Sequence, residues 1–138
     1  MKRILAVLSL FTLMVACKQA KTEPDTPSKM EEVMAIHDEV MPKMGTLGKL
    51  VAELKEKVDT TASGKAHEAA MKELQAANES MMDWMQGFGN RFDSDEILNG
   101  KTLTAQKQEW LLEEEAKVKA LREEINTSIA RAQQLLSE

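Results

Sequence analysis

The chain has 138 residues, a length that suits one domain better than two. Its content of 30% charged and 43% hydrophobic residues is typical of a folded globular protein, and scarce aromatics beside ten methionines favour packed helices over sheets. The formal net charge of −5, with no basic stripe, argues against DNA and RNA as partners, because nucleic-acid backbones are bound by clustered Lys and Arg.

Residues 1–16 have the three parts of a secretory signal peptide. Lys2 and Arg3 form a positive start, an apolar stretch follows as far as Val15, and Ala16 is the small residue before a cleavage point. The apolar stretch of about a dozen residues is shorter than the roughly 20 that span a bilayer. We therefore predict that this segment is a signal peptide that is removed.

The single cysteine, Cys17, follows this segment directly. Residues 13–17 (LMVAC) resemble the lipobox of bacterial lipoproteins, in which signal peptidase II cuts before a cysteine that carries diacylglycerol. Met14 departs from the usual Leu. The resemblance implies lipidation of Cys17 and attachment to a membrane, since each buried CH₂ contributes about 0.8 kcal/mol. The alternative is a soluble secreted protein with a stray cysteine.

Residues 17–28 are predicted to form a flexible tether between the lipid and the folded domain. The segment is polar, contains two prolines and lacks apolar periodicity. No Asp stands immediately after Cys17, so nothing resembles the inner-membrane retention signal of enterobacteria. We expect a location in the cell envelope, at the outer membrane in preference to the inner one.

Residues 29–138 are predicted to form an all-α, antiparallel three-helix bundle, with helices at about 29–58, 65–87 and 104–136. In the first helix Ser28 and Glu31 form a capping box, and Pro42 is expected to kink the helix without ending it. Apolar residues follow at alternating spacings of three and four, as in a helix packed on helices. This first seam consists of Met30, Val33, His37, Val40, Met44, Leu47, Val51, Leu54 and Val58.

The second and third helices have similar seams. Gly87 and Gly89 are expected to end the second helix, residues 90–102 to form the longest connection, and Thr104 to cap the third helix. The second seam consists of His67, Met71, Leu74, Asn78, Met81 and Met85, widened by Ala70, Ala77 and Trp84. The third consists of Leu111, Val118, Leu121, Ile125, Ile129, Ala132 and Leu136.

Few residues could carry chemistry. The sequence has no Gly-rich phosphate loop, no nucleophile elbow and no evident nucleophile–base pair, so we predict no enzyme activity and no catalytic residue. When the first two helices fold back about the turn near residue 62, His37 comes to lie beside Met85. His67 goes to the opposite end, and most of the methionines gather at the His37 end.

Three hypotheses remain open for the His37 end. Methionines can fill an irregular core near a proline kink. Alternatively, thioethers with an imidazole favour Cu(I), with a haem held by His37 and a methionine as a variant. The predicted copper ligands are Met34, His37, Met41, Met81 and Met85. The third hypothesis is a pliable groove for an apolar ligand or a partner helix. That groove would be lined by Met44, Met82, Trp84, Phe88 and Trp110.

Residues 34–45 (MAIHDEVMPKMG) and 82–85 (MDWM) resemble small helical lipoproteins of Bacteroidetes, and of flavobacteria especially. Some of these carry the label "viral A-type inclusion protein", which reflects coiled-coil composition and implies no activity. The sequence thus predicts a non-enzymatic, lipid-anchored envelope protein with a binding or scaffolding role, through a protein partner or self-association. No cofactor is expected. The alternative is a periplasmic lipoprotein that binds or buffers Cu(I).

Overall fold

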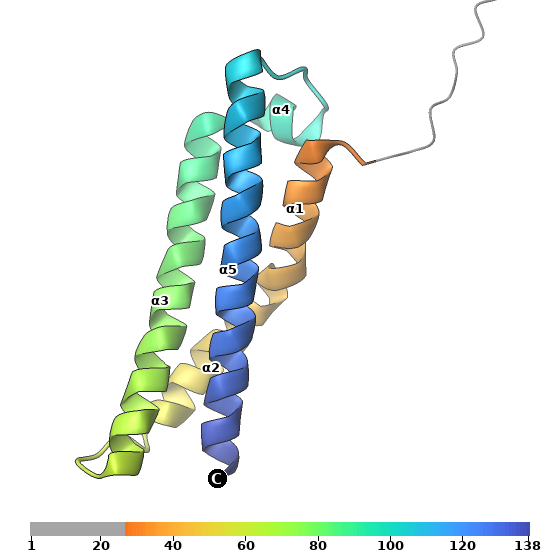
Figure 1. Ribbon diagram of the computed structural model, residues 1–138. Coiled ribbons are helices and arrows are strands. Elements are labelled where there is room, and N and C mark those ends of the chain that lie inside the picture. Colours follow the sequence, from red (N-terminus) through yellow and green to blue (C-terminus); the bar gives the residue numbers. More distant parts are fainter. Residues whose placement is uncertain (1–26) are drawn as a thin grey trace, which may run out of the picture.

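The computed structural model describes residues 27–138, and all regular secondary structure in that range is helical (Figure 1). The elements in chain order are α1 (Lys29–Val40), the 3-10 turn η1 (Met41–Lys43), α2 (Met44–Lys55), α3 (Ala62–Arg91), α4 (Ser94–Leu98) and α5 (Ala105–Ser137). The predicted all-α class is confirmed for this range. The signal peptide and Cys17 lie outside the described residues, as does nearly all of the predicted tether.

The beginning of α1 follows its local sequence. The Ser28 hydroxyl accepts a hydrogen bond from the Glu31 backbone N–H at 3.2 Å, and the Glu31 carboxylate accepts one from the Ser28 N–H at 2.6 Å. This is the predicted capping box. None of the described helices is long and apolar enough to cross a membrane.

The segment predicted as one helix over 29–58 is two α-helices separated by η1. Pro42 lies inside η1 and has no N–H to donate to the carbonyl of Asp38, one turn earlier, so α-helical hydrogen bonding is interrupted there. The second of these helices, α2, ends at Lys55, earlier than predicted.

The α3 helix is longer at both ends than predicted. The Thr61 hydroxyl caps its start by accepting a hydrogen bond from the Gly64 N–H at 3.0 Å. At the other end the helix continues through Gly87 and Gly89 to Arg91, so the predicted stop at these glycines is wrong. Each helical glycine costs about 1 kcal/mol, whereas burial of Phe88 between them contributes about 1.5–3 kcal/mol.

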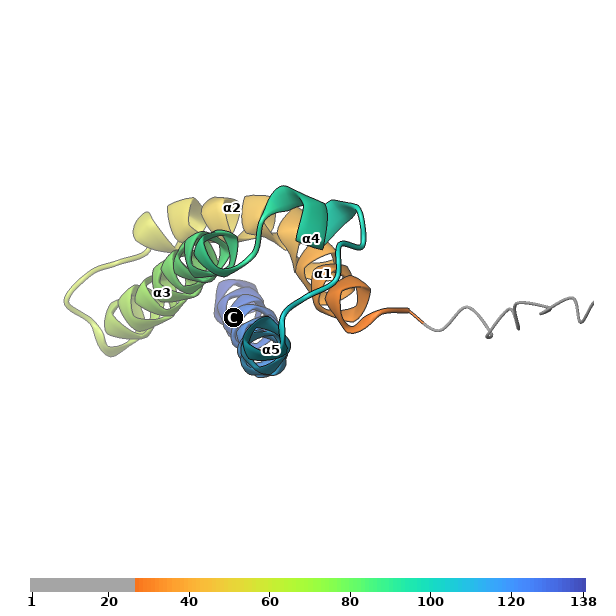
Figure 2. The same ribbon diagram turned by 90° about the horizontal axis from the view of Figure 1, so that it is seen from above.

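The connection after α3 contains a helix that was not predicted, α4. The Asp93 carboxylate accepts hydrogen bonds from the Asp95 and Glu96 N–H groups, and the Glu96 carboxylate accepts one from the Asp93 N–H at 2.9 Å. This Asp-x-x-Glu capping box lies within residues 90–102, which the sequence predicts as a connection. Short α4 lies across the end of the bundle where α1 begins (Figures 1 and 2). The predicted N-cap of the last helix, Thr104, is confirmed.

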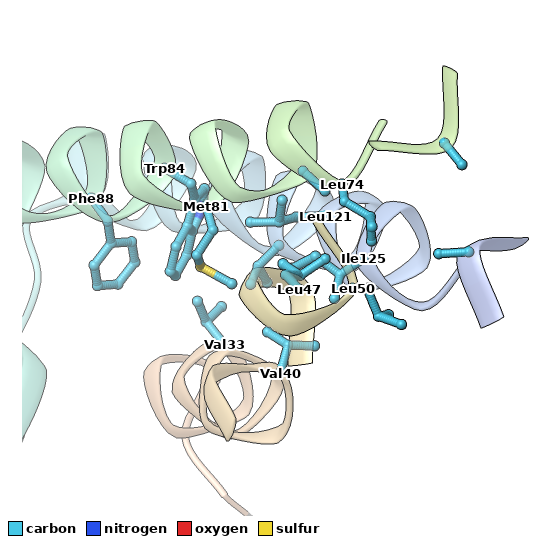
Figure 3. Packing of buried hydrophobic residues seen from close by; sticks show 14 of the residues in the cluster. Val33, Val40, Leu47, Leu50, Leu74, Met81, Trp84, Phe88, Leu121 and Ile125 are labelled. Atoms are coloured by element: carbon cyan, nitrogen blue, oxygen red, sulfur yellow. The ribbon is translucent and has the colours of Figure 1, made fainter. Parts of the chain in front are cut away.

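The chain passes along the molecule through α1 and α2, returns through α3, and passes along it again through α5 (Figure 1). The closely packed pairs are α3 with α5, α2 with α3, α1 with α5 and α2 with α5. Side chains from all four fill the core, as Figure 3 shows for Val33, Leu47, Leu74 and Ile125. The predicted seams were inaccurate in places, because Val58 and Asn78 are exposed and Leu50, which they omitted, is buried.

Candidate functional site

A row of four tilted aromatic rings runs from His37 of α1 to the end of α3. The ring centroids are 5.8 Å apart for His37 and Trp84, 4.9 Å for Trp84 and Phe88, and 4.8 Å for Phe88 and Phe92. We call these four residues the aromatic row. Trp84, Phe88 and Phe92 follow one another at intervals of four residues. They therefore lie along one face of α3, with Phe92 at its C-terminal cap. His37 therefore lies beside the second long helix, as predicted.

The imidazole of His37 is held by its neighbour in sequence. Its Nδ1 lies 2.9 Å from Oδ1 of Asp38, and the side chain is 16% exposed. Since a carboxylate only accepts hydrogen bonds, Nδ1 is the donor, and Nε2 is the ring nitrogen that can offer a lone pair. Within residues 27–138, the hydrogen bond of the His37 ring is the one at Nδ1.

The methionines of the predicted cluster have three different environments. Met81 is completely buried and extends from α3 toward Val33 of α1 (Figure 3). Met34, Met41 and Met85 are half-buried at the edge of the core. Met34, His37 and Met41 are spaced three and four residues apart, so they share one face of α1 and the turn that follows.

The five residues predicted to line one groove do not form a single surface. Met44 lines a shallow depression of about 250 Å³ between α2 and α3, and Met82 is 55% exposed. Trp84 and Phe88 belong to the aromatic row. Trp110 lies under the Arg91 guanidinium, whose carbon is 5.3 Å from the ring centroid.

Two of the larger depressions were not anticipated from the sequence. One, of about 580 Å³, lies between α3 and α5 beside Trp84 and is rimmed mainly by polar residues such as Asp83 and Lys117. The other, of about 430 Å³, lies at the end where the chain enters α1 and includes Met30 and Leu112. Both depend on residues brought together from distant parts of the chain, and no local pattern could have revealed them.

Two buried carboxylates are fully engaged in ion pairs. Glu96 accepts a hydrogen bond from the Lys107 ammonium at 2.5 Å, and Glu114 lies 3.0 Å from Arg91 and 2.9 Å from Lys117. The hydrogen bond from Lys107, and then that from the Asp93 N–H, hold the pKa of Glu96 below its ordinary value. Each of these carboxylates is thus held by charge-assisted contacts to cationic side chains.

Within residues 27–138 no three or more His, Cys, Asp or Glu side chains converge as metal ligands. The second histidine, His67, is at the far end of the bundle, where Nε2 lies 3.4 Å from the carbonyl oxygen of Leu135. In the described range, His67 Nδ1 and Trp84 Nε1 are buried without a hydrogen-bond partner.

Comparison with known proteins found no matching family model, no similar curated protein and no similar solved structure. The functional argument therefore rests on the residues of this chain.

Proposed function

We propose that this protein is a lipid-anchored, non-enzymatic protein of the cell envelope whose helical bundle has a binding or scaffolding role. Residues 1–16 serve as the signal peptide, Cys17 carries the lipid, and residues 17–28 form the tether. The outer membrane is the proposed location. The membrane is reached through the lipid on Cys17, and the bundle contacts a protein partner or a second copy of itself.

The observation that best supports this proposal is the place where the chain enters the bundle. Ser28 lies at the end that also carries α4 and the beginning of α5 (Figures 1 and 2). The α5 helix has 33 residues and therefore extends about 50 Å from that end. A lipid on Cys17 would hold the entry end near the bilayer and present the rest of the bundle away from it.

We further propose that α1, η1 and α2 act as one helix kinked at Pro42, so that the domain is an antiparallel three-helix bundle. Val40 and Leu47 are both buried and lie seven residues apart on either side of η1. This spacing of two helical turns supports one continuous buried stripe across the turn.

Exposed apolar side chains support a binding role. Met82 on α3, Leu112 on α5 and Leu98 on α4 are 55%, 58% and 77% exposed. Single exposed apolar residues are common on proteins, and these three are the most exposed large ones within residues 27–138. They are the first positions to replace in a search for the partner.

The anchor is tested by labelling cells with radioactive palmitate and by partitioning the protein into detergent. Wild type should incorporate the label and enter the detergent phase, and Cys17→Ser should do neither. The matched control is Met14→Leu, which introduces the residue usual in a lipobox and should leave labelling intact. Equal labelling of wild type and Cys17→Ser would contradict the anchor.

A further inference from the structure

The His37 side chain has the arrangement of a metal-binding imidazole. Metal-bound histidines commonly donate their second ring N–H to a carboxylate, which fixes the ring and makes the other nitrogen a better ligand. Asp38 does this for His37, with 2.9 Å between Oδ1 and Nδ1. The nitrogen that remains, Nε2, is the one through which the ring would bind.

Two methionines share a helical face with His37 by their spacing along the chain. Met34 lies one turn before His37 and Met41 one turn after it, and side chains at these spacings have Cβ atoms about 5–6 Å apart. Both methionines are half-buried and pack against the core. Met81, by contrast, has no exposed surface and extends from α3 into the core, toward Val33 (Figure 3). It is therefore core, although the sequence had placed it among the ligands.

We propose that Nε2 of His37 and the sulfurs of Met34 and Met41 bind a single Cu(I) ion. Thioether and imidazole ligands are soft or borderline and select Cu(I) over Mg²⁺ and Ca²⁺, which require oxygen. The Asp38 carboxylate, hydrogen-bonded to the same imidazole, offsets the positive charge of the ion. The site goes beyond the proposed anchor and does not depend on it.

Trp84 gives the site a spectroscopic reporter. Its ring centroid lies 5.8 Å from that of His37, whereas the other tryptophan, Trp110, contacts Arg91 near the beginning of α5. An ion held by His37 would lie near the Trp84 indole and quench its fluorescence.

The test titrates the full chain with Cu(I) under anaerobic conditions against a chromogenic Cu(I) chelator. All variants carry Cys17→Ser, because the free thiol would compete for Cu(I). The result then does not depend on whether Cys17 is lipidated. One equivalent should bind, and His37→Ala and Met41→Leu should each weaken binding tenfold or more. Met41→Leu nearly conserves volume, so the fold should survive, as far-UV circular dichroism would check.

Two controls make the result specific. Met82→Leu changes an exposed methionine outside the site and should leave the affinity unchanged. Trp110→Phe should retain the quenching by Cu(I), and Trp84→Phe should lose most of it. The proposal is overturned if no Cu(I) binds, or if His37→Ala and Met41→Leu bind as tightly as the parent chain.

Discussion

Gly64 and Gly87 both lie within α3, but their surroundings differ. A Cβ atom on Gly64 would collide with the Asp59 carboxylate and lie 2.5 Å from the Asp59 backbone nitrogen. A Cβ on Gly87 would meet nothing within 4 Å. The first glycine allows the turn before α3 to fold back against the helix, and the second is tolerated at an exposed position.

The two alanine substitutions should therefore have opposite effects. Gly87→Ala should raise the free energy of unfolding by about 0.5–1 kcal/mol, because alanine is the better helix former. Gly64→Ala should lower it by about 1–3 kcal/mol through overpacking against Asp59. Urea unfolding of both variants would check this, and a shift in the same direction for both would contradict the assigned surroundings.

Glu96 should make stability depend on pH. Its pKa is lowered in the folded state by Lys107, so its contribution is present above the ordinary value of 4.5 and is lost as the pH falls through the folded value. Glu96→Gln should lower the melting temperature at pH 7, and the difference from wild type should shrink below pH 4.5.

The control for this measurement is Glu53→Gln, a change at an exposed position of α2. Surface changes of this kind usually alter stability by less than about 0.5 kcal/mol. If the Glu96→Gln difference stayed the same from pH 7 down to pH 3, the ion pair with Lys107 would not be the source of the effect.

At the scale of the helices, the sequence predicted what depends on neighbouring residues. The caps at Ser28 and Thr104 are local, because each joins groups three residues apart. The extension of α3 past Gly87 could not be predicted, since it depends on burial of Phe88 in the aromatic row. The capping box at Asp93 is also local, since it joins Asp93 to Glu96, but it lies within a strongly polar run that is also typical of a loop.

The candidate site also has features that the sequence predicted and features that it could not predict. Folding back the first two long segments was enough to place His37 beside the second, where it meets Trp84. The environments of the methionines could not be predicted, because an unbranched side chain on a helix can point to the core or to its edge. Met81 and Met82 are adjacent in sequence, yet one is fully buried and the other exposed.

An aspartate introduced at a fully buried seam position should lower the free energy of unfolding more than one at a half-buried position. Ile125 on α5 has no exposed surface, whereas Val51 on α2 is half-buried and lines the shallow depression beside Met44. Ile125→Asp should destabilise by more than about 4 kcal/mol, because it buries an unpaired charge and leaves a cavity. Val51→Asp should cost clearly less, since its carboxylate can reach water. Chemical unfolding would compare them, and a larger loss at Val51 would contradict the structure.

At the scale of the whole molecule, the apolar core provides most of the stability and the charged surface interacts with water. The surface ion pairs, such as Arg131 with Glu73, join exposed side chains and contribute little individually. Stability comes mainly from the apolar stripe shared by α1, α2, α3 and α5. The charged outer faces keep the bundle solvated, which suits a domain held at a membrane surface by a lipid.

The measurement that tests the central proposal most directly is the intact mass of the protein isolated from its native membranes. The predicted result is a chain that begins at Cys17 and carries the added mass of a diacylglycerol and an acyl group. A chain that keeps residues 1–16, or one that has an unmodified Cys17, would contradict the proposal that this helical bundle is anchored by lipid.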